Sequence, residues 1–219
     1  MSTIRAVLFD MDGLLVDSER IGIRASVRAG RALGYPVDEA LAMQMLGLTR
    51  EGSAAKYRAA IPGMDVEAFH AAFVREMEDE IEREGVPCMP GARELLVWLE
   101  ARGVPCVLAT STARALADRR VERAGIARFF PLRVTGDDVV RSKPDPEIFL
   151  KAAALAETAP GACLVLEDSV NGIRAGRASG AVVGMVPDLT PYSGACAPYC
   201  DEVFQSLFEA REWLAQHIG

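Results

Sequence analysis

Two aspartates separated by a single residue follow a short apolar run near the start of the chain. The run is Ala6–Phe9, and the aspartates are Asp10 and Asp12. Two carboxylates close together at the end of a buried strand repel each other, and the pKa of one of them rises unless a cation lies between them. The pair therefore indicates a cation site.

Further polar positions stand directly after, or close to, other apolar runs. Thr110 ends one run, Glu167 and Asp168 end another, and Lys143 lies in the segment SKPDPEIF. Taken alone, each has an ordinary structural explanation, because Thr and acidic side chains often cap a following helix. A lysine before a proline is usually an exposed loop residue. The combination, with each group at its own strand end or loop, favours a functional site.

The combined set offers the groups that phosphoryl transfer requires. Asp10, Asp12 and Asp168 supply carboxylates for a hard cation such as Mg²⁺, which proteins bind through one or two carboxylates together with phosphate and water. Thr110 offers a hydroxyl beside backbone N–H groups, and Lys143 offers a balancing positive charge. Because phosphoryl transfer depends mainly on positioning and charge neutralisation, this set indicates phosphate chemistry.

The elements that must position these groups alternate between strands and helices after residue 87. Helical patterns separate strand-like apolar runs at residues 104–110, 132–135, 164–166 and 182–186. Such alternation predicts an α/β fold with a parallel sheet and helices on both faces, in which ligands bind at the carboxyl ends of the strands.

Residues 17–87 have a different pattern. Apolar residues recur there at helical spacing, first over 21–33 and then over 66–81, and no β-branched strand run occurs among them. We therefore expect a helical insertion, which leaves residues 1–16 and 88–219 for the α/β domain.

The bulk composition narrows the classes of protein. Half of the 219 residues are apolar, and 31 acidic residues against 24 basic ones give a net charge of −7. With no dense Lys/Arg stripe, neither a nucleic-acid nor a membrane partner is expected, and the pair Arg119 and Arg120 is interpreted as part of a solvated helix face. The five cysteines predict neither a disulfide framework nor a zinc site. We expect a cytoplasmic protein, because no signal peptide or membrane span is recognisable, and we take a monomer as the default.

Four segments of the chain resemble the motifs of a known family. The segments FDMDGLLVDSE, VLATST, SKPDPEIF and VLEDSVNGIRAG look like the four motifs of the haloacid dehalogenase superfamily, in its phosphatase and β-phosphoglucomutase-like branch. The resemblance spans nearly the whole chain. It implies a Rossmann-like core with Asp10 on the central strand, and a small α-helical cap, inserted after the first motif, that closes over the site.

The resemblance also implies a role for each matching residue. Asp10 is expected to attack phosphorus and form an aspartyl-phosphate, and Asp12 to protonate the leaving oxygen and then activate the hydrolytic water. Mg²⁺ is expected to bind the Asp10 carboxylate, the Asp12 main-chain carbonyl and Asp168, with Glu167 either a direct ligand or a supporting group. The phosphate-binding groups implied are Thr110, the Ser111 N–H and Lys143.

Two residues of the insertion are candidate substrate contacts. The segment GLTREGSAAKY looks like the family's specificity loop, which makes Arg50 a candidate contact for a sugar or a second phosphate. An arginine at the solvated start of a helix explains Arg50 equally well. Glu19 follows the first motif closely enough to reach a substrate from the hinge.

The expected activity is Mg²⁺-dependent hydrolysis of a small phosphorylated metabolite, with a sugar phosphate favoured. Two alternatives stay open, namely an isomerase of the β-phosphoglucomutase type and a non-catalytic phospho-accepting or scaffold protein. Asp12 and the insertion argue against the phospho-acceptor, which needs neither a general acid nor a lid. Gly22 and Leu46 argue against the isomerase, since the mutase pattern has a histidine and a basic residue at the matching positions. Asp12 also disfavours dehalogenation, because halide needs no proton.

Overall fold

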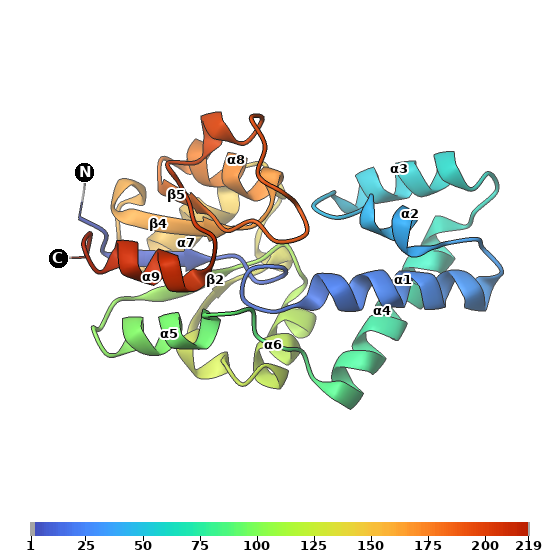
Figure 1. Ribbon diagram of the computed structural model, residues 1–219, viewed down its shortest axis with the longest axis horizontal. Helices are drawn as coiled ribbons and strands as arrows, with labels where there is room; N and C mark the ends of the chain where they lie inside the picture. The colour runs from blue at the N-terminus through green and yellow to red at the C-terminus, as the bar shows by residue number, and fades with distance from the viewer. Residues whose placement is uncertain (1–2, 219) are drawn as a thin grey trace.

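The structure, a computed structural model that describes residues 3–218, has two lobes, an α/β core and a helical cap (Figure 1). The cap consists of α1 (Ser18–Leu33), α2 (Glu39–Met43), α3 (Arg50–Ala60) and α4 (Val66–Glu84). The strands of the core are β1 (Ala6–Phe9), β2 (Cys106–Ala109), β3 (Leu132–Val134), β4 (Cys163–Glu167), β5 (Val182–Met185) and β6 (Glu202–Val203). The helices of the core are α5 (Ala92–Glu100), α6 (Arg114–Arg123), α7 (Glu147–Leu155), α8 (Val170–Ser179) and α9 (Leu207–Leu214).

Within the described residues the strands form one parallel sheet in the order β3-β2-β1-β4-β5-β6. β1 therefore lies at the centre, between β2 and β4. The chain winds outward from β1 to β3 and then returns to the other side of β1 through β4, so the direction of winding reverses between β1 and β4. The crevice at the carboxyl ends of two such strands is the usual ligand site of this architecture. Asp10 directly follows β1, and Asp168 directly follows β4.

The central strand is buried on both faces. Val7 and Phe9 pack into the apolar cluster shared with α5, α6 and α9, whereas Ala6 and Leu8 pack into the cluster shared with α7 and α8. Because successive side chains of a strand point to opposite faces, one short apolar run fills both layers. β1 is thereby held rigidly from both sides, which fixes the position of Asp10 at its end.

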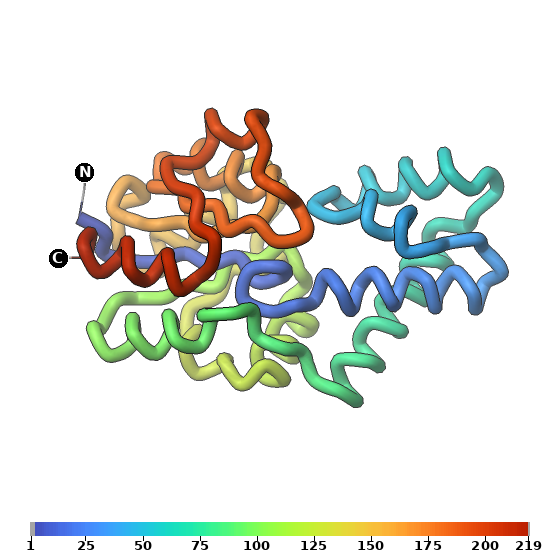
Figure 2. The backbone as a smooth tube through the Cα atoms, viewed as in Figure 1, coloured from blue at the N-terminus to red at the C-terminus, as the bar shows by residue number. Residues whose placement is uncertain are grey.

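Helices α1 and α4 form the body of the cap and pack side by side, and α2 and α3 lie on one side of them (Figure 2). Arg24 and Arg28 of α1 form ion pairs with Glu80 of α4, the second at 2.6 Å. The rings of Tyr57 on α3 and Phe69 on α4 pack with their centroids 4.7 Å apart, among other buried apolar residues of the cap. The cap therefore has an apolar cluster of its own.

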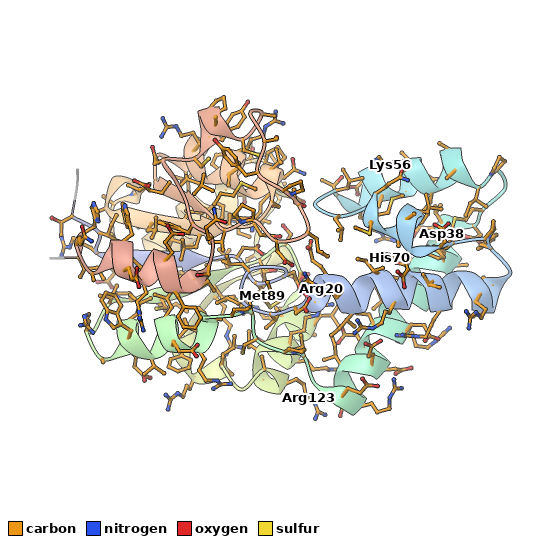
Figure 3. All side chains as sticks on the ribbon, in the orientation of Figure 1. Arg20, Asp38, Lys56, His70, Met89 and Arg123 are labelled. Carbon is orange, nitrogen blue, oxygen red and sulfur yellow. The ribbon has the colours of Figure 1, made fainter. Side chains whose placement is uncertain are left out.

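The chain enters and leaves the cap through two neighbouring segments. The Asp17 N–H donates to the carbonyl of Pro87 at 2.9 Å, and Val16 forms a β-bridge with Cys88. Arg20, at the start of α1 and labelled at the junction in Figure 3, binds both carboxylate oxygens of Asp188 in the core at 2.7 and 2.9 Å. The two covalent connections between the lobes thus lie side by side.

The predicted fold class, a parallel α/β core with an inserted helical cap, is confirmed. The strand predicted at 104–110 is shorter, because only Cys106–Ala109 pairs with its neighbours. The two-residue edge strand Glu202–Val203 was not predicted, since so short a run has no pattern. The boundaries of the insertion, residues 17–87, stay a prediction. None of the described helices is both long and apolar enough to cross a membrane.

Candidate active site

A buried lysine joins the acidic residues that end β1 and β4. The Lys143 ammonium donates to Asp10 Oδ1, to Glu167 Oε1 at 2.7 Å and to the carbonyl of Ala109 at 3.0 Å. Burial lowers the pKa of Lys143, but the charges of Asp10 and Glu167 outweigh it, so the pKa is raised and the ammonium stays charged. One positive charge is therefore shared between two carboxylates.

Both oxygens of Glu167 are occupied by donors. Oε1 accepts from Lys143, and Oε2 accepts from the N–H groups of Asp168 and Ser169, each at 3.1 Å, and from Ser169 Oγ at 2.9 Å. Gly172 leaves room for this carboxylate, because a Cβ there would overlap with it. Glu167 is therefore suited to positioning Lys143 and the start of α8, and less suited to direct metal ligation.

Asp168 differs from the other acids at the sheet edge, because one of its carboxylate oxygens has no hydrogen-bond partner among the described residues. Its Oδ2 is buried and accepts no hydrogen bond from the described residues, and burying such an oxygen without a partner is costly. This oxygen lies against Gly13, whose φ of +82° favours glycine and whose missing Cβ leaves space for it. The orphaned oxygen indicates a place for a ligand that the protein itself does not supply.

A divalent cation fits this position. Carboxylate oxygens of Asp10, Glu167 and Asp168 all lie within 4.8 Å of one another, and all three residues are buried. Three carboxylates against the single ammonium of Lys143 leave excess negative charge in a dry crevice. Oxygen donors of this kind suit a hard cation, which would satisfy the free oxygen of Asp168 and neutralise the excess.

Without a cation, the same crowding retains protons. Burial raises the pKa of Asp10 to about 8; the Lys143 ammonium opposes this rise, and the charges of Glu167 and Asp12 add to it. Burial, with the charges of Glu167 and Asp10, also raises the pKa of Asp168. Without a cation, the cluster therefore favours the protonated forms of Asp10 and Asp168.

Asp12 lies in a different environment, between donors from α1, α6 and the loop that precedes α6. Its Oδ1 accepts from Ser18 Oγ at 2.5 Å and from Arg120 Nη1 at 2.8 Å, and its Oδ2 accepts from Thr112 Oγ1 at 2.7 Å. Burial alone would raise the pKa of Asp12, but the Arg120 charge and these hydrogen bonds outweigh it and lower the pKa. The side chain of Asp12 is 27% exposed and borders the cleft described next, so an ionised carboxylate faces that cleft.

A cleft of about 580 Å³ lies between the cap and the core. The core contributes Asp12, Ser111, Thr112 and Arg120. The cap contributes a mostly apolar wall, which includes Leu46, Tyr57, Phe69, Phe73 and Met77. At the rim, Asn171 Nδ2 of the core donates to the Gly47 carbonyl of the cap at 2.9 Å, so the α2–α3 loop touches the core across the opening.

The two predicted contacts in the cap both border this cleft, but in different states. Glu19 has a buried oxygen, Oε2, without a partner among the described residues, and burial together with the charges of Asp188 and Asp12 raises its pKa to about 7. Arg50 is 56% exposed and forms an ion pair with Glu67. Glu19 is therefore free to accept a hydrogen bond from a ligand, whereas the charge of Arg50 already has a partner.

The predicted phosphate-binding residues lie at the carboxyl end of β2. Thr110 is buried, and its hydroxyl accepts from the Thr112 N–H at 3.1 Å. Ser111 is exposed and borders the cleft. Thr110 directly follows Ala109, whose carbonyl accepts from Lys143. The structure therefore places these groups next to the acidic cluster, and their roles stay predictions.

The interpretation of Arg120 as part of a solvated face is wrong. Arg120 is 6% exposed and binds Asp12 and, through Nη2, Glu78 of the cap at 2.9 Å. Its neighbour Arg119 is half exposed, as predicted. A signal for Arg120 was present in the sequence, because it shares one face of α6 with the buried residues Ala117 and Val121.

These features define a Rossmann-like hydrolase core with an acidic site at the switch point of the sheet and a cap over it. The chain belongs to the haloacid dehalogenase-like hydrolases, because the profile of that family matches residues 4–180. The expected family and enzyme class, a phosphatase of the haloacid dehalogenase type, are confirmed.

Individual relatives cover most of the chain. A phosphorylated carbohydrates phosphatase of Thermotoga maritima is 33% identical over 178 residues, which are 81% of this chain and 82% of that protein. Hexitol phosphatase A of Escherichia coli is 35% identical over 181 residues, 80% of each chain. A crystal structure of a haloacid dehalogenase family hydrolase from Deinococcus radiodurans, with bound phosphate and sodium, superposes with a TM-score of 0.81 at 28% identity and covers 99% of this chain and 97% of that one.

The raised pKa of Asp10 predicts a pH-dependent stability of the metal-free protein. The folded protein holds a proton on Asp10 up to about pH 8, whereas the unfolded chain releases it near the ordinary value of 3.8. The folded state thus binds more protons in this range, so the free energy of unfolding in chelator falls as pH rises from about 4 to 8. We expect the Tm to fall accordingly, with about 2–4 °C for each kcal/mol lost.

The Tm is measured in EDTA from pH 5 to 8 for wild type, for Asp10→Asn and for Asp79→Asn, a control at an exposed position. Asp10→Asn is expected to flatten the decline and to raise the Tm at pH 8, and Asp79→Asn to follow wild type. Adding Mg²⁺ should raise the wild-type Tm more at pH 8 than at pH 5. An Asp10→Asn protein with the wild-type slope would contradict the assignment of the repulsion to Asp10.

Proposed function

We propose that this protein is a Mg²⁺-dependent phosphatase that hydrolyses a small sugar or polyol monophosphate through an aspartyl-phosphate on Asp10. The observation that carries the proposal is the arrangement at the carboxyl ends of β1 and β4. There Asp10 is bonded by Lys143 and lies in the same 4.8 Å cluster as Asp168, which has a free oxygen. The carbohydrate and hexitol phosphatases among the relatives support a sugar or polyol substrate.

In the first half-reaction, a carboxylate oxygen of Asp10 forms a bond to phosphorus while the bond from phosphorus to the ester oxygen breaks. Asp12, ionised in the substrate-free protein, takes up a proton from solvent as the anionic substrate enters and gives it to the departing oxygen, so that an alcohol leaves instead of an alkoxide. In the second half-reaction, Asp12 takes a proton from water, which attacks the phosphorus, regenerates Asp10 and releases inorganic phosphate. In the substrate-free and cation-free protein Asp10 keeps a proton and Asp12 is ionised, so these roles require that a cation ionise Asp10 and that Asp12 be protonated when the anionic substrate is bound.

The remaining groups hold the phosphoryl group and balance its charge. Lys143 restrains Asp10 and neutralises charge beside it, and Thr110 with the Ser111 N–H would bind phosphate oxygens. Mg²⁺, held by the Asp10 carboxylate, the Asp12 main-chain carbonyl and Asp168, would supply further positive charge to the phosphoryl group. The cap limits the access of bulk water to the site.

The charges of the cleft favour a monophosphate with an uncharged body. In the described lining, Arg50 is paired with Glu67, and Arg120 is paired with Asp12 and Glu78. Burial, with the charge of Arg50, lowers the pKa of His70, although Glu67 opposes this, so the imidazole is neutral near pH 7. No cation of this described lining is thus left to receive a second phosphate. The monomeric state, the cytoplasmic location and the lack of nucleic-acid and membrane partners remain predictions.

The proposal is tested by incubating the purified protein with a panel of phosphorylated metabolites and measuring released phosphate. We expect turnover of sugar or polyol monophosphates in Mg²⁺, loss of turnover in EDTA, recovery when Mg²⁺ is restored, and no turnover by Asp10→Asn. Full activity in chelator would refute the metal assignment, and appreciable turnover by Asp10→Asn would mean that another residue is the nucleophile.

Two lysines give a matched pair of variants. Lys143→Met removes the ammonium that contacts Asp10, and we expect turnover to fall by roughly a hundredfold or more, as for other preorganised charge contacts. Lys56, labelled on the cap in Figure 3, donates to the Gln44 carbonyl at 3.0 Å, so Lys56→Met should change turnover little. Phosphate release at saturating substrate, on variants shown to be folded by circular dichroism, decides between them. Equal losses in the two variants would remove Lys143 from the site.

Hydrolysis is expected to exceed isomerisation. A mutase must retain a bisphosphate, and the paired cations of the cleft, together with Gly22 and Leu46 in its lining, offer no group for the second phosphate. With β-glucose 1-phosphate, released phosphate should exceed glucose 6-phosphate measured through glucose 6-phosphate dehydrogenase, with or without added glucose 1,6-bisphosphate. Isomerisation that outruns phosphate release would establish the mutase instead.

A further inference from the structure

Arg120 is an arginine buried between the two lobes. It projects from α6 of the core and is 6% exposed, and its guanidinium donates to Asp12 Oδ1 at 2.8 Å and to Glu78 Oε1 at 2.9 Å. The first partner lies in the core, two residues after the nucleophile, and the second lies on α4 of the cap. Burying an arginine is costly unless its charge is paired, and here the pairing uses both lobes.

The contact with Asp12 has a fixed geometry. Arg120 shares the Oδ1 oxygen with Ser18, while Thr112 holds Oδ2. Ser18 begins α1 of the cap, whereas Thr112 and Arg120 belong to the core. The carboxylate is therefore held by two donors of the core and one of the cap, and the arginine among them is itself bound by the cap.

We propose that Arg120 is the positioning residue for Asp12, holding its carboxylate toward the cleft and coupling this orientation to the place of the cap helix α4 through Glu78. The inference rests on the proposed function, because it gives Asp12 its role in both half-reactions. Arg120 itself does not touch the reacting atoms. When the cap moves away, Glu78 releases the guanidinium and Asp12 loses its fixed orientation.

Neighbouring ion pairs across the same junction provide controls for a purely structural role. Arg123 of α6, labelled in Figure 3, pairs with Glu82 of α4, one turn further along both helices. No hydrogen bond or ion pair of the described residues links Arg123 to Asp12. Arg123→Met therefore removes a link between cap and core without changing the donors around the carboxylate.

Two substrates distinguish a loss of proton donation by Asp12 from a general loss of activity. The alcohol of an alkyl phosphate leaves only if it receives a proton, whereas nitrophenolate leaves p-nitrophenyl phosphate as a stable anion. In Arg120→Met we expect kcat/KM for glycerol 1-phosphate to fall about a hundredfold or more, the usual contribution of a general acid. For p-nitrophenyl phosphate we expect a loss below about tenfold, since kcat/KM reports the first half-reaction.

The second half-reaction gives an independent readout. Because Asp12 also activates water, Arg120→Met should form aspartyl-phosphate from p-nitrophenyl phosphate faster than it hydrolyses it. Rapid mixing should then show a burst of nitrophenolate close to one equivalent of enzyme, followed by a slow steady state with KM little changed. Arg120→Lys, which keeps the charge but not the planar fork, should recover part of the alkyl activity. Glu78→Gln, which keeps an acceptor for Arg120, should retain more of it than Glu78→Leu.

The outcomes test the role of Arg120 separately from the proposed phosphatase activity. If wild type releases no phosphate from any substrate, the proposed function fails; if wild type is active, only Arg120 is tested. Equal losses on both substrates without a burst, or the same selective loss in Arg123→Met, would overturn the proposal. Should Arg120→Met fail to fold, Glu78→Leu decides, because it leaves Arg120 in place. A selective loss of alkyl activity in Glu78→Leu supports the coupling, and an unchanged ratio of the two substrates overturns it.

Discussion

Excess negative charge in a dry crevice is the constraint on which the rest of this structure depends. Three carboxylates gather at the carboxyl ends of β1 and β4 with one ammonium among them, and one of their oxygens has no partner among the described residues. The neighbouring backbone is shaped to permit this, since Gly13 and Gly172 leave the space that the carboxylates fill. Such an arrangement is unfavourable for a protein alone and would become favourable with a cation bound among the carboxylates.

The two aspartates of the first motif illustrate how surroundings separate like groups. Asp10 lies among other acids, and its pKa is raised by burial; Asp12 lies among an arginine and two hydroxyl donors, and its pKa is lowered despite burial. Only Met11 stands between them, but the chain turns so that one carboxylate faces the crevice and the other faces the cleft. A short spacing in sequence thus yields two chemical environments, one that retains a proton and one that favours the ionised carboxylate.

The sequence was sufficient for the fold class and for the residues at strand ends, because an apolar strand followed by polar groups is a local pattern. It was insufficient where the partner of a residue lies elsewhere. Glu78 is 42 residues from Arg120 in the chain. The sequence alone therefore cannot distinguish an arginine on a solvated helix face from one that is buried and paired with a distant glutamate. The pairing of Arg50 with Glu67 was hidden for the same reason. Strand ends also depend on pairing, and so the run at 104–110 yields a strand of only Cys106–Ala109.

The adjacency of the two connections between the lobes has an evolutionary consequence. Because the chain leaves and re-enters the core through adjacent segments joined by the Asp17–Pro87 hydrogen bond, the path of the sheet does not depend on what is inserted between them. Helices of other lengths and linings can be exchanged there, and the range of substrates can diverge while the phosphate chemistry is inherited unchanged. The proposed role of Arg120 would limit this freedom, since a replacement cap would again need an acidic partner at the place of Glu78. One position in the cap would thereby be tied to the core, while the lining around it is free to vary.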